Sequence, residues 1–236
     1  MNTITASQPL PDSLEPIENL GLIDRFQPDE CQELRICVVD PSDSLPNMDP
    51  IRIGIDFDST IAQIAEPWLE RFNALKGTSL RLSDWSDWNI NFIPKKDHPL
   101  FFSLLTPDIY DSAEPYARAS AVIAKWSVRP NIELCCVTSN PTNDSEAFQI
   151  AKAKWLSTHI PCLAGQLISA RTKSGLGLDI LIDDAPHHQT GDYIPILVRR
   201  PWNVRIKSEF AFSEWNEADG VLNKALTKLK RGCALM

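Results

Sequence analysis

The pattern of hydrophobic and polar positions changes at about residue 51. From there, short apolar runs that end in polar residues alternate with segments in which apolar residues recur every three or four positions. Short bounded runs are typical of buried strands, and the longer spacing is typical of amphipathic helices. We expect strands at 51–55, 132–137, 166–169, 179–182 and 194–198.

Helices are expected between and after these strands. The first follows Glu66 and places Trp68, Leu69, Phe72 and Leu75 on one face, with Gly77 as a stop signal. The later helices are expected at 115–127, at 145–158, and at about 208–231, where an apolar stripe begins with Trp215.

Strands that alternate with helices indicate an α/β protein, with a parallel sheet covered on both faces. We therefore expect a three-layer, Rossmann-like core within residues 51–232. Residues 78–112 mix aromatic residues, prolines and charges without a clean period. We interpret about 64–113 as a small, mainly helical cap inserted after the first strand, and about 208–231 as the closing helix.

The first 50 residues have a different composition. They contain seven of the 18 prolines, ten acidic residues and two basic ones, so they carry the whole formal net charge of -8. Such a segment is a poor continuous helix or sheet, and we interpret residues 1–50 as an acidic, proline-rich extension. The run LRICVV at 34–39 is a candidate edge strand within it.

Composition excludes several classes of protein. The 236 residues are 43% hydrophobic and 23% charged, which is ordinary for a soluble globular protein. No apolar stretch is long enough to cross a membrane, and residues 1–10 have neither the basic start nor the apolar middle of a signal peptide. We therefore expect a cytoplasmic protein without a transmembrane segment. The neutral body lacks the basic surface that a polymeric nucleic acid requires, and nothing indicates an oligomeric state. The six cysteines have no metal-site spacing and are expected to be reduced thiols.

Polar residues follow several of the apolar runs at the point where each expected strand ends. The four endings are Asp56-Phe57-Asp58-Ser59-Thr60, Thr138-Ser139-Asn140, Lys173, and Asp183-Asp184. Ligands of open parallel sheets bind beyond the carboxyl ends of the strands, so these residues are candidates for one site.

This set suits phosphoryl transfer assisted by Mg2+. Carboxylate and carbonyl oxygens hold a hard cation, and a lysine can neutralise phosphate charge. Asp56 and Asp58 are two positions apart and face the same side of an extended strand end. One carboxylate can attack phosphorus while the other handles the proton of the leaving group.

In this order, the motifs resemble those of the haloacid dehalogenase superfamily of phosphatases. The matching segments are DFDST, CCVTSN, an isolated Lys173 and LIDD. Within that superfamily, the sequence is similar to the 5′(3′)-deoxyribonucleotidase family over about residues 51–230. The similar stretches are EPWLERF, VTSNP, AKAKWLSTHIP followed by ARTKS, LIDDAP, and PWN at 201–203.

The resemblance implies a role for each matching residue. Asp56 would be the nucleophile that forms an aspartyl-phosphate, and Asp58 the general acid and then the general base. Asp56, the Asp58 backbone carbonyl and Asp184 would hold Mg2+, with Asp183 beside them; between the last two, Asp184 is the favoured ligand. Thr138, with Ser139 next to it, and Lys173 would bind the phosphate of a small phosphorylated substrate, most simply a nucleotide.

Some positions depart from the family pattern. Ser59 stands where this branch usually has glycine, and Gln63 replaces an acid found in some relatives. Ile64 occupies a loop position at which close relatives place an aromatic residue against the nucleobase. These departures weaken the inference of a deoxynucleotide substrate and leave the phosphatase chemistry intact.

Other residues have two readings. Trp85 and Trp88 can stack on a substrate ring, although aromatic residues in a small module more often form its core. His187 and His188 follow the acid pair, but magnesium prefers oxygen, so we interpret them as loop histidines. Cys233 begins a four-residue ending that fits a prenylation signal. The alternative is an ordinary helix end, which Gly232 and the nearby basic residues also fit.

The main hypothesis is a magnesium-dependent phosphomonoesterase, specifically a 5′-nucleotidase that acts on (deoxy)nucleoside monophosphates. Two alternatives stay open. One is a phosphatase of another small ester, such as a sugar phosphate or a modified nucleic-acid end. The other is a non-catalytic phosphate-binding or adaptor protein that keeps the fold.

Overall fold

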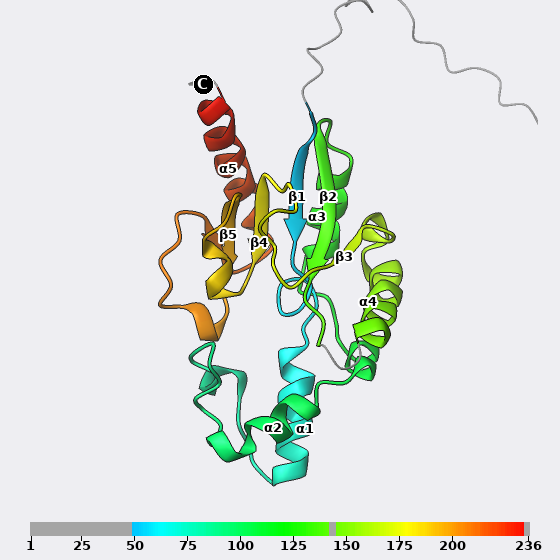
Figure 1. The fold of residues 1–236 in the computed structure, drawn as a ribbon, viewed down its shortest axis with the longest axis vertical. Helices are drawn as coiled ribbons and strands as arrows, with labels where there is room; N and C mark the ends of the chain where they lie inside the picture. The colour runs from blue at the N-terminus through cyan, green and yellow to red at the C-terminus, as the bar shows by residue number, and fades with distance from the viewer. Residues whose placement is uncertain (1–48, 142–144, 234–236) are drawn as a thin grey trace, which may run out of the picture. The chain divides into compact units, whose positions relative to one another are not determined.

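A six-stranded parallel sheet forms the centre of the computed structural model, which describes residues 49–141 and 145–233 (Figure 1). The order of the strands is β3-β2-β1-β4-β5-β6, and every neighbouring pair is parallel. The strands are β1 (Ile51–Ile55), β2 (Ile132–Thr138), β3 (Leu167–Ser169), β4 (Ile180–Asp183), β5 (Ile194–Val198) and β6 (Ala211–Phe212). The order reverses between β1 and β4, which is where open sheets of this kind bind ligands.

In the described residues, five α-helices and six short 3-10 helices lie between and after the strands. The helices are α1 (Ala65–Lys76), α2 (His98–Ser103), α3 (Ala119–Ser127), α4 (Ser145–His159) and α5 (Ala218–Cys233). The 3-10 helices are η1 (Leu82–Asp84), η2 (Lys95–Asp97), η3 (Pro107–Asp111), η4 (Pro161–Leu163), η5 (Pro186–Gln189) and η6 (Pro201–Asn203). None of the helices in the described part of the chain is both long and apolar enough to span a membrane. The expected α/β class is confirmed.

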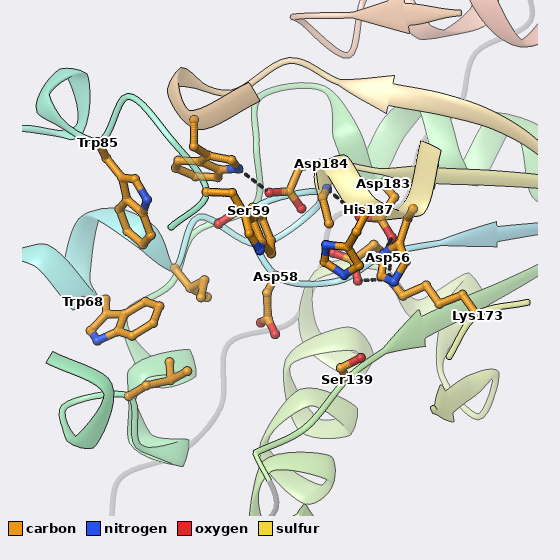
Figure 2. Close-up of a pocket in the computed structure, with 16 residues that line it drawn as sticks. Asp56, Asp58, Ser59, Trp68, Trp85, Ser139, Lys173, Asp183, Asp184 and His187 are labelled. Carbon is orange, nitrogen blue, oxygen red and sulfur yellow. Dashed lines mark hydrogen bonds and ion pairs between the residues drawn. The ribbon is translucent and has the colours of Figure 1, made fainter. Parts of the chain in front are cut away.

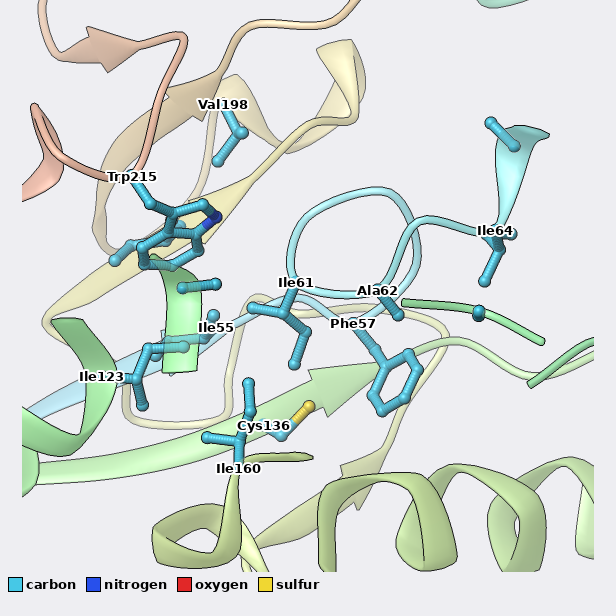
Figure 3. Packing of buried hydrophobic residues seen from close by; sticks show 14 of the residues in the cluster. Ile55, Phe57, Ile61, Ala62, Ile64, Ile123, Cys136, Ile160, Val198 and Trp215 are labelled. Carbon is cyan, nitrogen blue, oxygen red and sulfur yellow. The ribbon is translucent and has the colours of Figure 1, made fainter. Parts of the chain in front are cut away.

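The two faces of the sheet are covered by different material. Alternate residues of β1, β2 and β4, such as Ile55, Cys136 and Ile182, belong to a large cluster with side chains of α3, α4 and α5. The intervening residues, such as Val137 and Leu181, belong to a smaller cluster completed by loop residues. Figure 3 shows part of the large cluster around Ile55. Because both faces are buried, the strands read as nearly continuous apolar runs.

Most expected elements lie within a few residues of the observed ones, and some details were wrong. The helix expected at 115–127 begins only at Ala119, after Arg118 adopts a left-handed conformation with φ of 70°. Leu75 was expected on the buried face of α1 but is 59% exposed. Trp215 was expected within the closing helix but precedes it, because α5 begins at Ala218. The two-residue strand β6 was not predicted.

The segment between β1 and α3 is helical, as expected of the inserted cap. It contains α1, η1, η2, α2 and η3, and no strand of the central sheet. Helix α1 ends at Gly77, whose φ of 64° is the left-handed conformation that a terminating glycine supplies. Figure 1 shows β1 pointing toward the part of the molecule that contains α1 and α2. The insertion therefore lies at the carboxyl end of the sheet, where the candidate site is expected.

Two predictions concern residues outside the described part of the chain. The candidate edge strand at 34–39 and the acidic extension as a whole lie there. Residues 234–236, which follow Cys233 in the possible prenylation signal, also lie outside it.

Replacing Ile55 with alanine tests how strongly the large cluster holds β1 in place. Ile55 is fully buried, so Ile55→Ala should lower the free energy of unfolding by about 2–5 kcal/mol through lost burial and a residual cavity. Ile150, which is 63% exposed on α4, supplies the matched control. Urea unfolding of Ile150→Ala should stay within about 0.5 kcal/mol of the wild type; equal losses in both variants would contradict the assignment of the core.

Candidate active site

The carboxyl ends of β1, β2 and β4 bring the predicted polar residues to one edge of the sheet. Ile55, the last residue of β1, pairs with Cys136 of β2 and with Ile182 of β4. The next residue, Asp56, donates its backbone N–H to the Ile182 carbonyl at 2.8 Å. Asp183 ends β4, so this register sets Asp56 beside the acid pair.

Three carboxylates form a buried cluster at this edge. One oxygen from each of Asp56, Asp183 and Asp184 lies within 4.8 Å of the others. The three residues are 7%, 1% and 3% exposed. Buried carboxylates at such separations repel one another, so the cluster requires compensating positive charge.

Lys173 supplies part of that charge. Its ammonium group contacts Asp56 and donates to Asp183 Oδ2 at 2.6 Å, with only 2% of the residue exposed. Burial opposes the charge on Lys173, but the two carboxylates outweigh it and raise its pKa above the ordinary value. Asp183 also accepts bonds from His188 Nδ1 at 2.7 Å and from the Ala185 backbone at 2.8 Å.

Asp184 is oriented by groups that hold both of its carboxylate oxygens. The Thr60 hydroxyl donates to Oδ1 at 3.2 Å, and the Trp202 indole donates to Oδ2 at 2.8 Å. The side-chain amide of Asn203 donates to the Asp184 backbone carbonyl at 2.7 Å. The PWN segment at 201–203 therefore fixes the position of this acid.

The charges within the cluster are not balanced. Burial, followed by repulsion from Asp183 and Asp58, raises the pKa of Asp56 to about 6 although Lys173 lowers it. Burial, followed by repulsion from Asp56 and Asp183, raises the pKa of Asp184 well above its ordinary value. An all-oxygen cluster with excess negative charge fits a hard divalent cation.

Asp58 lies apart from this cluster, with its carboxylate pointing away from Asp56 and Asp184 (Figure 2). The Tyr110 hydroxyl donates to Asp58 Oδ1 at 2.8 Å, and Lys152 Nζ donates to Oδ2 at 2.6 Å. Burial and the Asp58 charge raise the pKa of Tyr110 well above its ordinary value, so its hydroxyl stays a donor. The side chain of Asp58 keeps 27% exposure and lines the pocket.

The two residues expected to bind phosphate after β2 differ in position. Ser139 lines the pocket, and its hydroxyl donates to the Ala170 carbonyl at 2.9 Å. Thr138 is fully buried and does not line the pocket; its hydroxyl accepts a bond from Lys152 at 2.6 Å. Of these two residues, the structure brings only Ser139 to the wall of the pocket.

The loop after the first two acids is held by buried groups of the core. Ser59 has a φ of 59°, a left-handed conformation that explains the glycine usual at this position in relatives. Arg200 Nε donates to the Ser59 carbonyl at 2.6 Å, and the Trp215 indole donates to the Thr60 carbonyl at 3.1 Å. The guanidinium of Arg200 also stacks 3.7 Å from the ring of Tyr116. These contacts maintain the turn without a glycine.

A cavity of about 230 Å3 opens between the carboxylate cluster and the inserted segment (Figure 2). The polar lining includes Asp56, Asp58, Lys173 and both acids of the pair. The apolar lining includes Ile64, Trp68, Trp85, Trp88 and Leu105. The cavity therefore joins a charged end to an aromatic wall.

Two residues of the aromatic wall pack against other residues that line the cavity. The rings of Trp85 and Trp202 lie 4.9 Å apart between centroids, and those of Trp88 and His187 lie 5.3 Å apart. Trp85 is 8% exposed and belongs to the large hydrophobic cluster, so it both forms the core and lines the cavity. Trp88 is 43% exposed.

Comparison with known proteins identifies the family. Residues 49–228 match the family described as 5′ nucleotidase, deoxy (pyrimidine), cytosolic type C (NT5C). The chain belongs to the NT5C family. A curated relative, the 5′(3′)-deoxyribonucleotidase of Clostridium acetobutylicum, is 26% identical over 137 residues, which cover 57% of this chain and 73% of that protein.

Solved structures agree on the fold. A haloacid dehalogenase-like protein from Agrobacterium tumefaciens superposes with a TM-score of 0.51 and 12% identity, covering 73% of this chain and 97% of that one. A haloacid dehalogenase-like hydrolase from Streptococcus pneumoniae has a TM-score of 0.50 and 13% identity, covering 73% and 98%. The expected resemblance to haloacid dehalogenases is confirmed. This member of the NT5C family is a hydrolase that acts on phosphoric monoesters.

Several residues of this NT5C site were missed by sequence reasoning. Lys152 carried a usable signal, because it shares the buried face of α4 with Phe148 and Trp155, where a lysine requires a buried partner. Tyr110 carried none, since it lies in an irregular segment. His188, interpreted as a loop histidine, bonds directly to Asp183.

The raised pKa of Asp56 predicts a pH dependence of stability for the metal-free protein. The folded protein holds a proton at Asp56 up to about pH 6, whereas 3.8 is the ordinary value. The resulting stabilisation is complete below the ordinary value and is lost as the pH rises through about 6. Asparagine does not titrate, so Asp56→Asn should not lose stability in this pH range. Relative to the wild type, its free energy of unfolding should rise by up to about 3 kcal/mol between about pH 4 and pH 7. Urea unfolding in EDTA measures the gain; parallel pH profiles would contradict it.

Proposed function

We propose that this chain is a magnesium-dependent 5′-nucleotidase that hydrolyses (deoxy)nucleoside monophosphates through an aspartyl-phosphate on Asp56. The observation that carries this proposal is the position of Asp56, which belongs to an all-oxygen cluster and lines the same cavity as an aromatic wall. The charged end suits a phosphate group, and the wall suits a nucleoside. Membership of the NT5C family supports this reaction class.

Asp56 would act as the nucleophile. One of its oxygens would form a bond to phosphorus as the bond to the leaving oxygen breaks, giving the aspartyl-phosphate. Asp58 would give a proton to the leaving oxygen and then take one from the water that attacks the aspartyl-phosphate. The separate settings of the two carboxylates support this division, because Asp56 lies in the cluster whereas Asp58 is held by Tyr110 and Lys152.

The metal would be held by Asp56, the backbone carbonyl of Asp58 and Asp184, with Asp183 fixing Lys173 beside them. When bound, Mg2+ would supply positive charge to the phosphoryl oxygens. Lys173, the Thr138 hydroxyl and Ser139 would bind the same oxygens. Lys173 is suited to this role because it is fixed on two sides by Asp56 and Asp183.

The aromatic wall would bind the leaving nucleoside. Trp85 and Trp68 are rigid within the core, and Trp88 offers an exposed indole at the edge of the cavity. Ile64 lines the cavity as an apolar contact without a ring face, so stacking there would depend on the tryptophans. We also propose a cytosolic location, in line with the wording of the family description.

A substrate panel tests the proposed reaction. The purified full chain with Mg2+ should release phosphate from deoxynucleoside and ribonucleoside monophosphates faster than from sugar phosphates, and excess EDTA should stop the release. Faster turnover of sugar phosphates would favour the alternative small ester. Tight binding of the nucleotides without any release would favour the non-catalytic adaptor.

Removing the nucleophile separates catalysis from binding. Asp56→Asn should abolish phosphate release, because an amide does not form the aspartyl-phosphate. Circular dichroism and urea unfolding should show that the variant is folded. Turnover in folded Asp56→Asn at more than a small fraction of the wild-type rate would refute the assignment of Asp56.

The bond from Trp202 to Asp184 predicts an effect on metal affinity. Trp202→Phe removes the indole donor and keeps an aromatic ring, so Mg2+ should bind about 10–100-fold more weakly. The dependence of thermal unfolding on Mg2+ concentration measures this affinity without any substrate. Trp88→Phe, which alters the same cavity without touching Asp184, is the matched control and should leave the affinity unchanged.

A further inference from the structure

The carboxylate of Asp58 is held at both oxygens by side chains from two different parts of the chain. Tyr110 donates to Oδ1 at 2.8 Å from η3, at the end of the inserted segment. Lys152 donates to Oδ2 at 2.6 Å from α4, a helix of the core. We use the name Asp58 clamp for the pair Tyr110 and Lys152.

Lys152 is held in this position by further contacts. The residue is fully buried, and its ammonium group also donates to the Thr138 hydroxyl at 2.6 Å and to the Ser139 carbonyl at 3.4 Å. Its nitrogen lies 5.3 Å from the centre of the Phe57 ring. A buried ammonium with three acceptors is costly to move, because each lost contact leaves an unpaired donor.

The ring of Tyr110 is fixed as firmly. Phe57 packs edge-on against it at 5.5 Å between ring centroids, and Phe148 of α4 does so at 6.1 Å. Tyr110 is 5% exposed, so the side chain that directs its hydroxyl at Asp58 is closely packed. The clamp therefore has two rigid members that approach one carboxylate from different elements.

We propose that Tyr110 and Lys152 are positioning residues that hold the Asp58 carboxyl group where it exchanges protons with the leaving oxygen and with water. This inference rests on the proposed phosphatase function. Proton transfer requires the donor within hydrogen-bond reach of the reacting oxygen, so a carboxyl group free to rotate transfers protons less often. Neither clamp residue reaches the substrate in this role; both act through Asp58.

Substrates with different leaving groups isolate this role. A nucleoside leaves as an alkoxide-like oxygen that requires a proton, whereas para-nitrophenolate leaves without one. Tyr110→Phe removes only the hydroxyl donor, and kcat/KM reports the step in which the leaving group departs. The variant should lose about 10–100-fold in kcat/KM for a deoxynucleoside monophosphate and less than about threefold for para-nitrophenyl phosphate.

Lys152→Met provides a second variant, and a neighbouring lysine provides its control. Because Lys152 also contacts Thr138, Lys152→Met should reduce kcat/KM for both substrates, with the larger loss for the nucleotide. Lys154 lies on the same helix, pairs with the exposed Asp111 at 3.0 Å, and keeps 74% side-chain exposure. Lys154→Met should match the wild type with both substrates. Thermal unfolding checks that each variant is folded.

The outcomes separate the clamp from the proposed function. If the wild type hydrolyses both substrates and Tyr110→Phe loses kcat/KM selectively for the nucleotide, the clamp is supported. If the wild type hydrolyses both substrates and Tyr110→Phe loses activity equally with both, or with neither, the clamp is overturned and the phosphatase function stands. A wild type that hydrolyses neither substrate overturns the proposed function and the clamp with it.

Discussion

Buried negative charge at the carboxyl end of the sheet is the constraint on which the arrangement of this protein depends. Asp56, Asp183 and Asp184 share a region within 4.8 Å, and Asp58 lies nearby. Isolated buried carboxylates are unfavourable, so partners must come from elsewhere in the chain. Lys173 arrives from the loop after β3, and Lys152 from α4. Charge pairing, together with burial of apolar surface, thus helps to place the loop after β3 and helix α4 against the sheet.

Sequence reasoning recovered the sheet because a parallel strand buried on both faces leaves a clear apolar run. It also recovered the polar endings, because the carboxyl ends of parallel strands meet at one edge. It missed β6, which has only two residues, and misplaced Trp215, whose apolar character fits a helix stripe as well as the loop before it. Lys152 and Tyr110 were missed because their partners become neighbours only through tertiary packing.

The departures from the family pattern have a structural setting. Ser59 keeps the left-handed turn because Arg200 and Trp215 bond the carbonyls of Ser59 and Thr60. Such a conformation is unfavourable for a residue with a side chain, and the added bonds offset it. Ile64 lines the cavity beside Trp68 and Trp85, so the wall stays apolar although this position has no ring. The charged end and the wall are thus structurally independent of each other at these two positions.

Trp202 does not share that independence. Its indole N–H bonds Asp184 while its ring lies 4.9 Å from Trp85 in the wall. A mutation that reshapes the wall at this point therefore also disturbs a carboxylate of the charged cluster. Evolution toward a larger or smaller leaving group would be steered away from Trp202 and toward Ile64, Trp88 and Leu105, whose replacement leaves that bond untouched.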